Sequence, residues 1–138
     1  MYNTFMITNM NALTISEPIS TLFQNLASPA RVSILLAIGH GEACVCHLEA
    51  ILGWRQAYIS QHLMSLRKAE VLKDRKVGRF VYYSLREPSI LSLVQSAANL
   101  CGLKPWEVEK MTTPDPGPNC ECPICLPNPI QVDEVTTR

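Results

Sequence analysis

The sequence lacks a long apolar run and a secretory leader pattern. Its 138 residues contain no stretch of about 18 consecutive apolar residues, so a membrane-spanning helix is not expected. The opening residues, MYNTFMITNMNALTIS, lack the basic start followed by an apolar core that a secretory signal needs. We therefore expect a cytoplasmic protein with no membrane partner.

The residue patterns of common catalytic sites are missing as well. We find no paired carboxylates, no nucleophile–base set and no glycine-rich phosphate loop. An enzyme is therefore not expected. The length favours one domain with a modest hydrophobic core.

The net charge is zero, but the charges are unevenly distributed. Between Arg55 and Arg86 the chain has eight basic and two acidic residues, a local charge of +6. Such a basic segment is the electrostatic footprint of a nucleic-acid contact. By itself it would also fit a solvated strand edge that is protected from aggregation.

Composition divides the chain into three parts. Residues 1–16 show no sustained hydrophobic period, and we expect a flexible arm there. Residues 17–104 carry helical and strand periods and form the predicted folded domain. Residues 105–138 are rich in proline and cysteine, have no apolar period, and form a predicted tail that cannot build a core by itself.

The predicted fold is mainly α-helical with one β-hairpin. Ser16 is the expected cap of the first helix, and Gly78 is the expected turn of the hairpin. Apolar spacing predicts an inward face for the fourth helix at Ile59, Leu63 and Leu66. The predicted elements are helices over 17–26, 29–38, 41–53 and 54–69, a hairpin over 72–85, and a last helix over 88–101.

Two short helices joined by a tight turn and followed by a basic hairpin describe a winged helix–turn–helix. The helix over 54–69 would then enter the major groove, and the hairpin would be the wing. His62 has a second interpretation, as a half-buried structural histidine. The predicted DNA-contacting residues are Gln56, Tyr58, Ser60, Gln61, His62, Ser65, Lys68 and Arg79.

The segment CVCHLEAILGWRQAYISQHLMSLRKAEVLKDRKVGRFVYYSL resembles the ArsR/SmtB family of metal-responsive repressors. The shared motifs are the CVC start, the LG turn, the Q…S-x-HL…LR helix and the G-R-x-V-Y-Y-x-L wing. The resemblance covers about residues 17–101. It implies a homodimeric winged-helix repressor that releases double-stranded operator DNA when a metal or metalloid binds. It also implies a dimer interface on the first and last helices, made by Ile19, Leu22, Leu91, Val94 and Ala98.

Cys44 and Cys46 stand at the start of a predicted helix, although residues two apart do not share a helical face. Near a helix N-terminus the backbone is not fully helical, so both thiols could turn toward one centre. Helix-terminal N–H groups would favour the thiolate, which is the form that binds metal. The resemblance implies the same role, because CVC is a thiolate sensor site in members that respond to arsenite, cadmium or lead. The alternative is a pair of small hydrophobic side chains in the core.

The pair needs additional ligands, and the sequence offers two sources. A third thiol follows the pair closely in some arsenite sensors, but here that position is Glu49, and no histidine occurs after His62 to build the family's zinc site on the last helix. Cys101 lies on the apolar side of its predicted helix, where packing is the expected role. The motif CECPIC instead offers three closely spaced thiols, Cys120, Cys122 and Cys125.

These tail thiols could complete the Cys44/Cys46 site, from the same or the partner subunit, or hold a separate ion. All-sulfur ligation favours cadmium, lead, mercury, copper(I) or arsenite, and zinc suits a four-thiolate site. The predicted function is a metal-sensing or metalloid-sensing repressor in which the bound ion displaces the DNA-reading helix. The alternatives are a repressor that senses thiol oxidation or persulfides, and a metal-carrying thiol protein.

Overall fold

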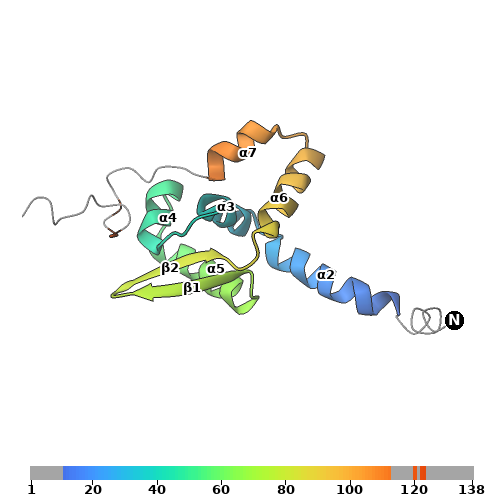
Figure 1. Ribbon diagram of the computed structural model, residues 1–138, viewed down its shortest axis with the longest axis horizontal. Coiled ribbons are helices and arrows are strands. Elements are labelled where there is room, and N and C mark those ends of the chain that lie inside the picture. The colour runs from blue at the N-terminus through green and yellow to red at the C-terminus, as the bar shows by residue number, and fades with distance from the viewer. Residues whose placement is uncertain (1–10, 113–119, 121, 124–138) are drawn as a thin grey trace, which may run out of the picture.

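The computed structural model describes residues 11–112, 120, 122 and 123. The chain is mostly helical, with one two-stranded antiparallel sheet that projects from the helices as a hairpin (Figure 1). The described part contains no helix that is both long enough and apolar enough to cross a bilayer. In chain order the elements are α2 (Ala12–Leu26), α3 (Pro29–Ile38), α4 (Val45–Leu52), α5 (Gln56–Lys68), β1 (Leu72–Val77), β2 (Phe80–Leu85), α6 (Ser89–Leu100) and α7 (Pro105–Thr112).

Helix α3 lies at the centre of the fold and packs against α4, α5, α6, α7 and β2. Its apolar residues Ile34 and Leu35 are fully buried. The predicted inward face of α5 is confirmed, because Ile59, Leu63 and Leu66 are all fully buried in the same core. This packing fixes α5 to α4 and to the base of the hairpin. Residues of the opposite face of α5, such as Gln61 and Lys68, are exposed.

The predicted hairpin is also confirmed. Strands β1 and β2 pair from Leu72 opposite Leu85 to Val77 opposite Phe80. The turn between them contains Gly78 at φ +58°, a conformation that glycine adopts without a steric penalty. Together with α4 and α5, this hairpin gives the predicted winged helix–turn–helix.

The predicted start of the first helix is wrong. Helix α2 begins at Ala12, because the side chain of Asn11 accepts a hydrogen bond from the Leu13 N–H at 3.2 Å and caps the helix there. Residues 12–16, predicted to belong to the arm, are therefore helical. Pro18 lies inside the helix instead of in its first turn.

The predicted tail boundary at 105 is wrong as well, because helix α7 occupies 105–112. Pro105 begins it, and the Glu107 carboxylate accepts a hydrogen bond from the Lys104 N–H at 2.7 Å. Helix α7 buries Val108 and Thr112 as it packs on α3 and α6. Its end lies directly against Gly39, where a Cβ atom would collide with the Thr112 carbonyl oxygen.

Candidate functional site

Cys44 and Cys46 point toward the same centre. Cys44 is the N-cap of α4, with an extended backbone (φ −86°, ψ 170°), and Cys46 lies in the first turn. This change in backbone conformation brings their Sγ atoms to 2.8 Å from each other. The His47 N–H also donates to Cys44 Sγ at 3.4 Å. The expected convergence of the two thiols is confirmed, and its cause is the capping position of Cys44.

Two tail cysteines of the same chain complete a cluster of four thiols. Cys120 Sγ lies 3.3 Å from Cys46 Sγ and 4.0 Å from Cys44 Sγ. With Cys122, all four sulfur atoms lie within 4.8 Å of one another. Cys44, Cys120 and Cys122 are buried, and Cys46 is half-buried. We call this group the thiol cluster.

The donor set of the thiol cluster fits a thiophilic ion. A tetrahedral zinc site with Zn–S bonds of about 2.3 Å places its sulfur atoms about 3.8 Å apart, and the observed separations lie on both sides of that value. Cys125 lies outside the described residues. Cys101 is exposed and outside the thiol cluster, so its predicted packing role is wrong.

The wing packs against the thiol cluster. The sequence did not predict this contact. Tyr82 of β2 is buried among the sulfur atoms, and Phe80 and Ala50 pack around them. Residues 80 and 82 share one face of the strand because side chains alternate along a strand. That alternation is readable in the sequence. The pairing of this face with the cysteines is not.

Burial controls the protonation of Cys44. It raises the pKa of Cys44 to about 12, and the neighbouring Cys46 thiol acts in the same direction. The hydrogen bond from the His47 N–H lowers the pKa, but it does not outweigh these effects. The helix-terminal N–H thus favours the thiolate, as expected, but at Cys44 burial outweighs its effect. Without an ion its sulfur is protonated at neutral pH, and an ion must displace that proton.

The predicted DNA-contacting residues of α5 lie on its outer side. Gln56, Tyr58, Gln61 and Lys68 are exposed, whereas Ser60, His62 and Ser65 are half-buried. The Ser65 hydroxyl donates to the Gln61 carbonyl oxygen at 3.1 Å within the helix. This hydrogen bond uses the backbone of Gln61, and the Gln61 side chain is exposed.

An aromatic group supports the N-terminal part of α5. The ring of Tyr58 meets Trp54 edge to face at 5.6 Å between centroids, and it meets His62 in the same way at 4.7 Å. His62 thus has a structural contact, in agreement with its second interpretation. The exposed edge of Tyr58 remains accessible. The contacts orient Tyr58 at the end of the helix that meets base edges in winged helices.

Several basic side chains of the 55–86 segment are held in ion pairs. Arg67 pairs with Asp74 at 3.1 Å, Arg75 with Glu42 at 2.9 Å, and Arg86 with Glu70 at 3.5 Å. Among the described residues, five other cations of this segment have no ion-pair partner: Arg55, Lys68, Lys73, Lys76 and Arg79. The guanidinium of Arg79 lies 5.3 Å from the Phe80 ring centroid at the tip of the wing.

The apolar surface expected for dimerisation is only partly where the resemblance places it. Leu91 and Ala98 are buried within a single chain, so they are not available as a surface. Ile19, also expected at the interface, is about half exposed, and it lies with Ile15 and Phe23 of α2 along a shallow groove.

Sequence comparison identifies related proteins. The family model described as bacterial regulatory protein, arsR family, matches residues 28–74. The transcriptional repressor SmtB homolog of Synechocystis sp. is 33% identical over 84 residues, covering 61% of this chain and 64% of the relative. The arsenical resistance operon repressor of Escherichia coli is 45% identical over 65 residues, covering 46% and 56%. The cadmium resistance regulatory protein CadC of Listeria innocua is 35% identical over 82 residues, covering 59% and 69%.

The chain thus spans less than two thirds of the length of the first two of these relatives. Solved structures agree with the fold. Reduced HlyU from Vibrio cholerae has a TM-score of 0.58 at 26% identity, covering 63% of this chain and 92% of that one. HlyU from Vibrio vulnificus, a transcriptional regulator, has a TM-score of 0.56 at 28% identity, covering 72% and 98%. With matching helices, wing and sequence motifs, the chain belongs to the ArsR/SmtB family of transcriptional regulators.

Proposed function

We propose that this protein is a cytoplasmic transcriptional repressor that senses thiophilic ions. As a homodimer it binds double-stranded operator DNA, and it leaves the DNA when an ion binds the thiol cluster. The observation that carries the proposal is the convergence of four sulfur atoms within 4.8 Å beside the wing and α4, the helix that packs on α5. The proposed ligands are Cys44, Cys46, Cys120 and Cys122, with Cys125 as a further candidate from the tail.

The ligand set favours soft ions. Thiolates bind cadmium, lead, mercury, arsenite and zinc, and four of them suit a four-coordinate divalent ion. The names of two relatives refer to cadmium and arsenical resistance, which supports the same group of inducers. We choose cadmium as the test ion because a four-sulfur set suits it and its thiolate complexes absorb in the ultraviolet.

The proposed DNA contacts divide between base edges and phosphates. Gln56, Tyr58, Ser60, Gln61, His62 and Ser65 would lie in the major groove, where Gln61 is suited to an adenine edge. Lys68 and Arg79 would contact phosphates. Their lack of an ion-pair partner within the described residues supports this role. The exposed apolar residues of α2 would pack against the second copy of the chain.

Release follows from linkage between the two sites. Helix α4 carries Cys46 and packs directly against α5, so closing the thiol cluster around an ion would shift the reading helix. The ion then favours a dimer geometry that fits the operator poorly, and DNA weakens ion binding by the same factor. A coupling of about 1–3 kcal/mol changes the affinity by roughly 5- to 150-fold.

A redox switch is the competing proposal. The Sγ atoms of Cys44 and Cys46 lie 2.8 Å apart. In this proposal an oxidant joins two thiols of the cluster in a disulfide, and no ion binds. A metal carrier has weaker support, because it has no use for a recognition helix and a wing.

The test is operator binding with and without each candidate signal. A fluorescent duplex selected by the protein from a random-sequence pool is titrated in reducing buffer alone, with cadmium chloride, with arsenite, and without reductant but with peroxide. We expect at least a fivefold loss of affinity with cadmium or arsenite. Release by peroxide alone would favour the redox switch. Unchanged affinity in every arm would refute both proposals.

A further inference from the structure

The wing strand and the thiol cluster share side chains. Tyr82 is 2% exposed and packs against Cys44, Cys120 and Cys122, while Phe80 packs on the same cluster. Phe80 directly follows Arg79, the proposed phosphate contact at the wing tip. An ion that draws the sulfur atoms together therefore acts on a surface that belongs to the wing, in addition to α4.

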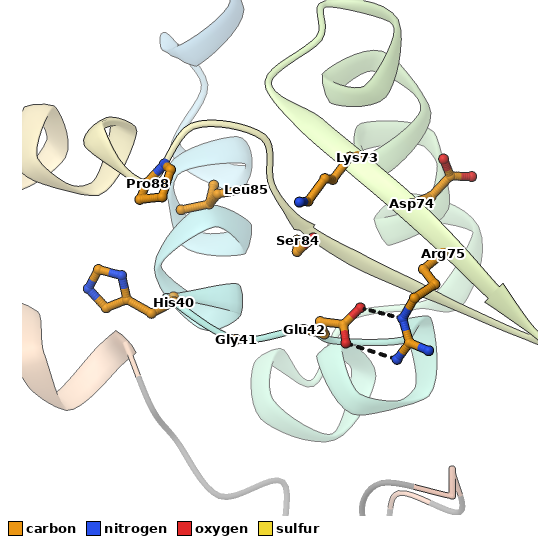
Figure 2. Close-up of a pocket in the computed structure, with 10 residues that line it drawn as sticks. His40, Gly41, Glu42, Lys73, Asp74, Arg75, Ser84, Leu85 and Pro88 are labelled. Atoms are coloured by element: carbon orange, nitrogen blue, oxygen red, sulfur yellow. Dashed lines mark hydrogen bonds and ion pairs between the residues drawn. The ribbon is translucent and has the colours of Figure 1, made fainter.

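The three residues before α4 connect the same site to both strands. Glu42 accepts two hydrogen bonds from the Arg75 guanidinium of β1, at 2.9 and 3.0 Å (Figure 2). Ala43 exchanges two backbone hydrogen bonds with Tyr83 of β2, at 2.8 and 3.0 Å. Cys44, the next residue, supplies a sulfur atom to the thiol cluster. Cys44 is thus connected to the hairpin through its two preceding neighbours.

An open cleft beside this connection leaves room for movement. It has a volume of about 1000 Å³ and lies between residues 39–42 and the base of the hairpin (Figure 2). The Glu42–Arg75 pair spans the cleft at one end, and Lys73 and Ser84 line it. Arg75 also lies over the Tyr82 ring, 5.4 Å from its centroid. The Arg75 guanidinium therefore contacts both Glu42, two residues before Cys44, and Tyr82, the aromatic residue that packs on the thiol cluster.

We infer that Glu42 and Arg75 are positioning residues that transmit occupation of the thiol cluster to the wing. In this arrangement the wing changes its angle relative to α5 when the cluster closes, and Arg79 loses its phosphate. The inference rests on the proposed function, and it adds a route through the hairpin to the route through α5. The pair is partly exposed, with side chains 33% and 55% accessible. Such a pair contributes little to stability but fixes orientation.

The test compares three variants of the full-length protein: Glu42→Gln, Arg75→Gln and the control Asp74→Asn. Asp74 is the matched control because it is next to Arg75 and its side chain is 33% exposed, as is that of Glu42. Asp74 pairs with Arg67 of α5, whereas Glu42 belongs to the segment that leads into Cys44. For each protein, cadmium affinity is measured from the thiolate absorbance. Operator affinity is then measured with and without saturating cadmium.

We expect Glu42→Gln to retain its cadmium affinity and its metal-free operator affinity. The factor by which cadmium lowers operator affinity should become roughly two- to fivefold smaller, which corresponds to the free energy of an exposed ion pair. Arg75→Gln should behave in the same way. The charge swap Glu42→Arg with Arg75→Glu should restore release. The Asp74→Asn control should respond like the wild type.

Two outcomes would overturn the inference: wild-type release in Glu42→Gln, or an equal loss in Asp74→Asn. A wild-type protein that binds cadmium without leaving DNA would instead refute the proposed function. The inference would fall with it. The wild-type measurement therefore tests the function, and the variants test the route.

Discussion

The Sγ atoms of Cys46 and Cys120 lie 3.3 Å apart, although 74 positions separate these residues in the sequence. One belongs to the first turn of α4, and the other to the segment beyond α7. The contact makes Cys120 a part of the thiol cluster within a single chain. Two tail residues thus bring a third and a fourth thiol to the CVC pair, and these are the ligands that we propose for the pair.

Removal of one cluster thiol should weaken cadmium binding. We expect Cys44→Ser to lower cadmium affinity by more than about tenfold. Removing a side chain that only supports a ligand already costs about tenfold or more, and removing the ligand itself should cost more. The readout is the thiolate-to-cadmium absorbance. Cys101→Ser is the control, since Cys101 is exposed and outside the thiol cluster. An equal effect of both substitutions would contradict the assigned ligand set.

Cutting the chain after Thr113 should separate sensing from folding. The shortened protein keeps α7 with its buried Val108 and Thr112, so we expect a melting temperature and operator affinity close to those of the full chain. It loses Cys120 and Cys122, so the absorbance amplitude per ion should fall and release should require more cadmium. The double variant Cys120→Ser with Cys122→Ser is the matched comparison. An unchanged cadmium response would assign the tail thiols to a separate ion.

Cadmium affinity should increase with pH. Burial holds the pKa of Cys44 at about 12, so at neutral pH this thiol is protonated and ion binding releases its proton. Each proton released per ion makes the affinity about tenfold stronger for each pH unit. Titration with a competing chelator between pH 6 and 8 measures the slope. A flat profile would show that the thiols of the metal-free protein are already deprotonated.

Gln61→Ala and Arg79→Ala should affect DNA binding in different ways. Gln61 is exposed on α5, so its loss should relax the preference at one base pair by about 1–3 kcal/mol. Loss of Arg79 at the wing tip should weaken binding to all DNA sequences similarly. It should also reduce the salt dependence of the affinity by the amount expected for about one phosphate contact. Binding to operator duplexes with single base changes, at several salt concentrations, distinguishes the two. Intact operator affinity in both variants would refute the groove assignment.

The exposed face of α2 should be required for dimerisation. We expect Phe23→Asp to shift the protein toward monomer and to weaken operator binding, because it places a charge in the apolar contact. Light scattering gives the mass, and circular dichroism checks that the fold is kept. Thr21→Asp is the control because Thr21 is exposed on the same helix outside the groove. A wild-type mass for Phe23→Asp would exclude this face.

Local patterns were sufficient to predict the helix–turn–helix and the hairpin. The helical spacing of Ile59, Leu63 and Leu66 and the strand-forming residues around Gly78 all agree with the observed elements. These signals depend on neighbours within one turn or one hairpin. Helix α7 was missed because the prolines after it dominated the composition, although Pro105 and Glu107 are ordinary helix-start residues.

The candidate site was predictable only in its first half. The CVC spacing at a helix start is a local signal, and Cys44 takes the capping position that the convergence requires. The meeting of Cys46 with Cys120, and of the thiols with Tyr82, depends on how α7 and the hairpin pack on α3. Such long-range packing has no local sequence pattern. For this reason the sequence alone leaves three possibilities for the tail thiols. They could complete the Cys44/Cys46 site of the same chain, complete that of the partner subunit, or hold a separate ion.

Under the proposed function, the close contact between Gly39 and Thr112 gives one glycine a role in the response to metal. Gly39 has φ +57°, and any side chain there would also meet the end of α7. Cys44 lies five positions after Gly39 and Cys120 eight positions after Thr112, so both halves of the thiol cluster start from one backbone contact. A substitution at position 39 would unseat α7 and the thiols beyond it. A genetic screen for repressors that no longer respond to metal should therefore recover changes at Gly39, which belongs neither to the thiol cluster nor to the proposed DNA contacts.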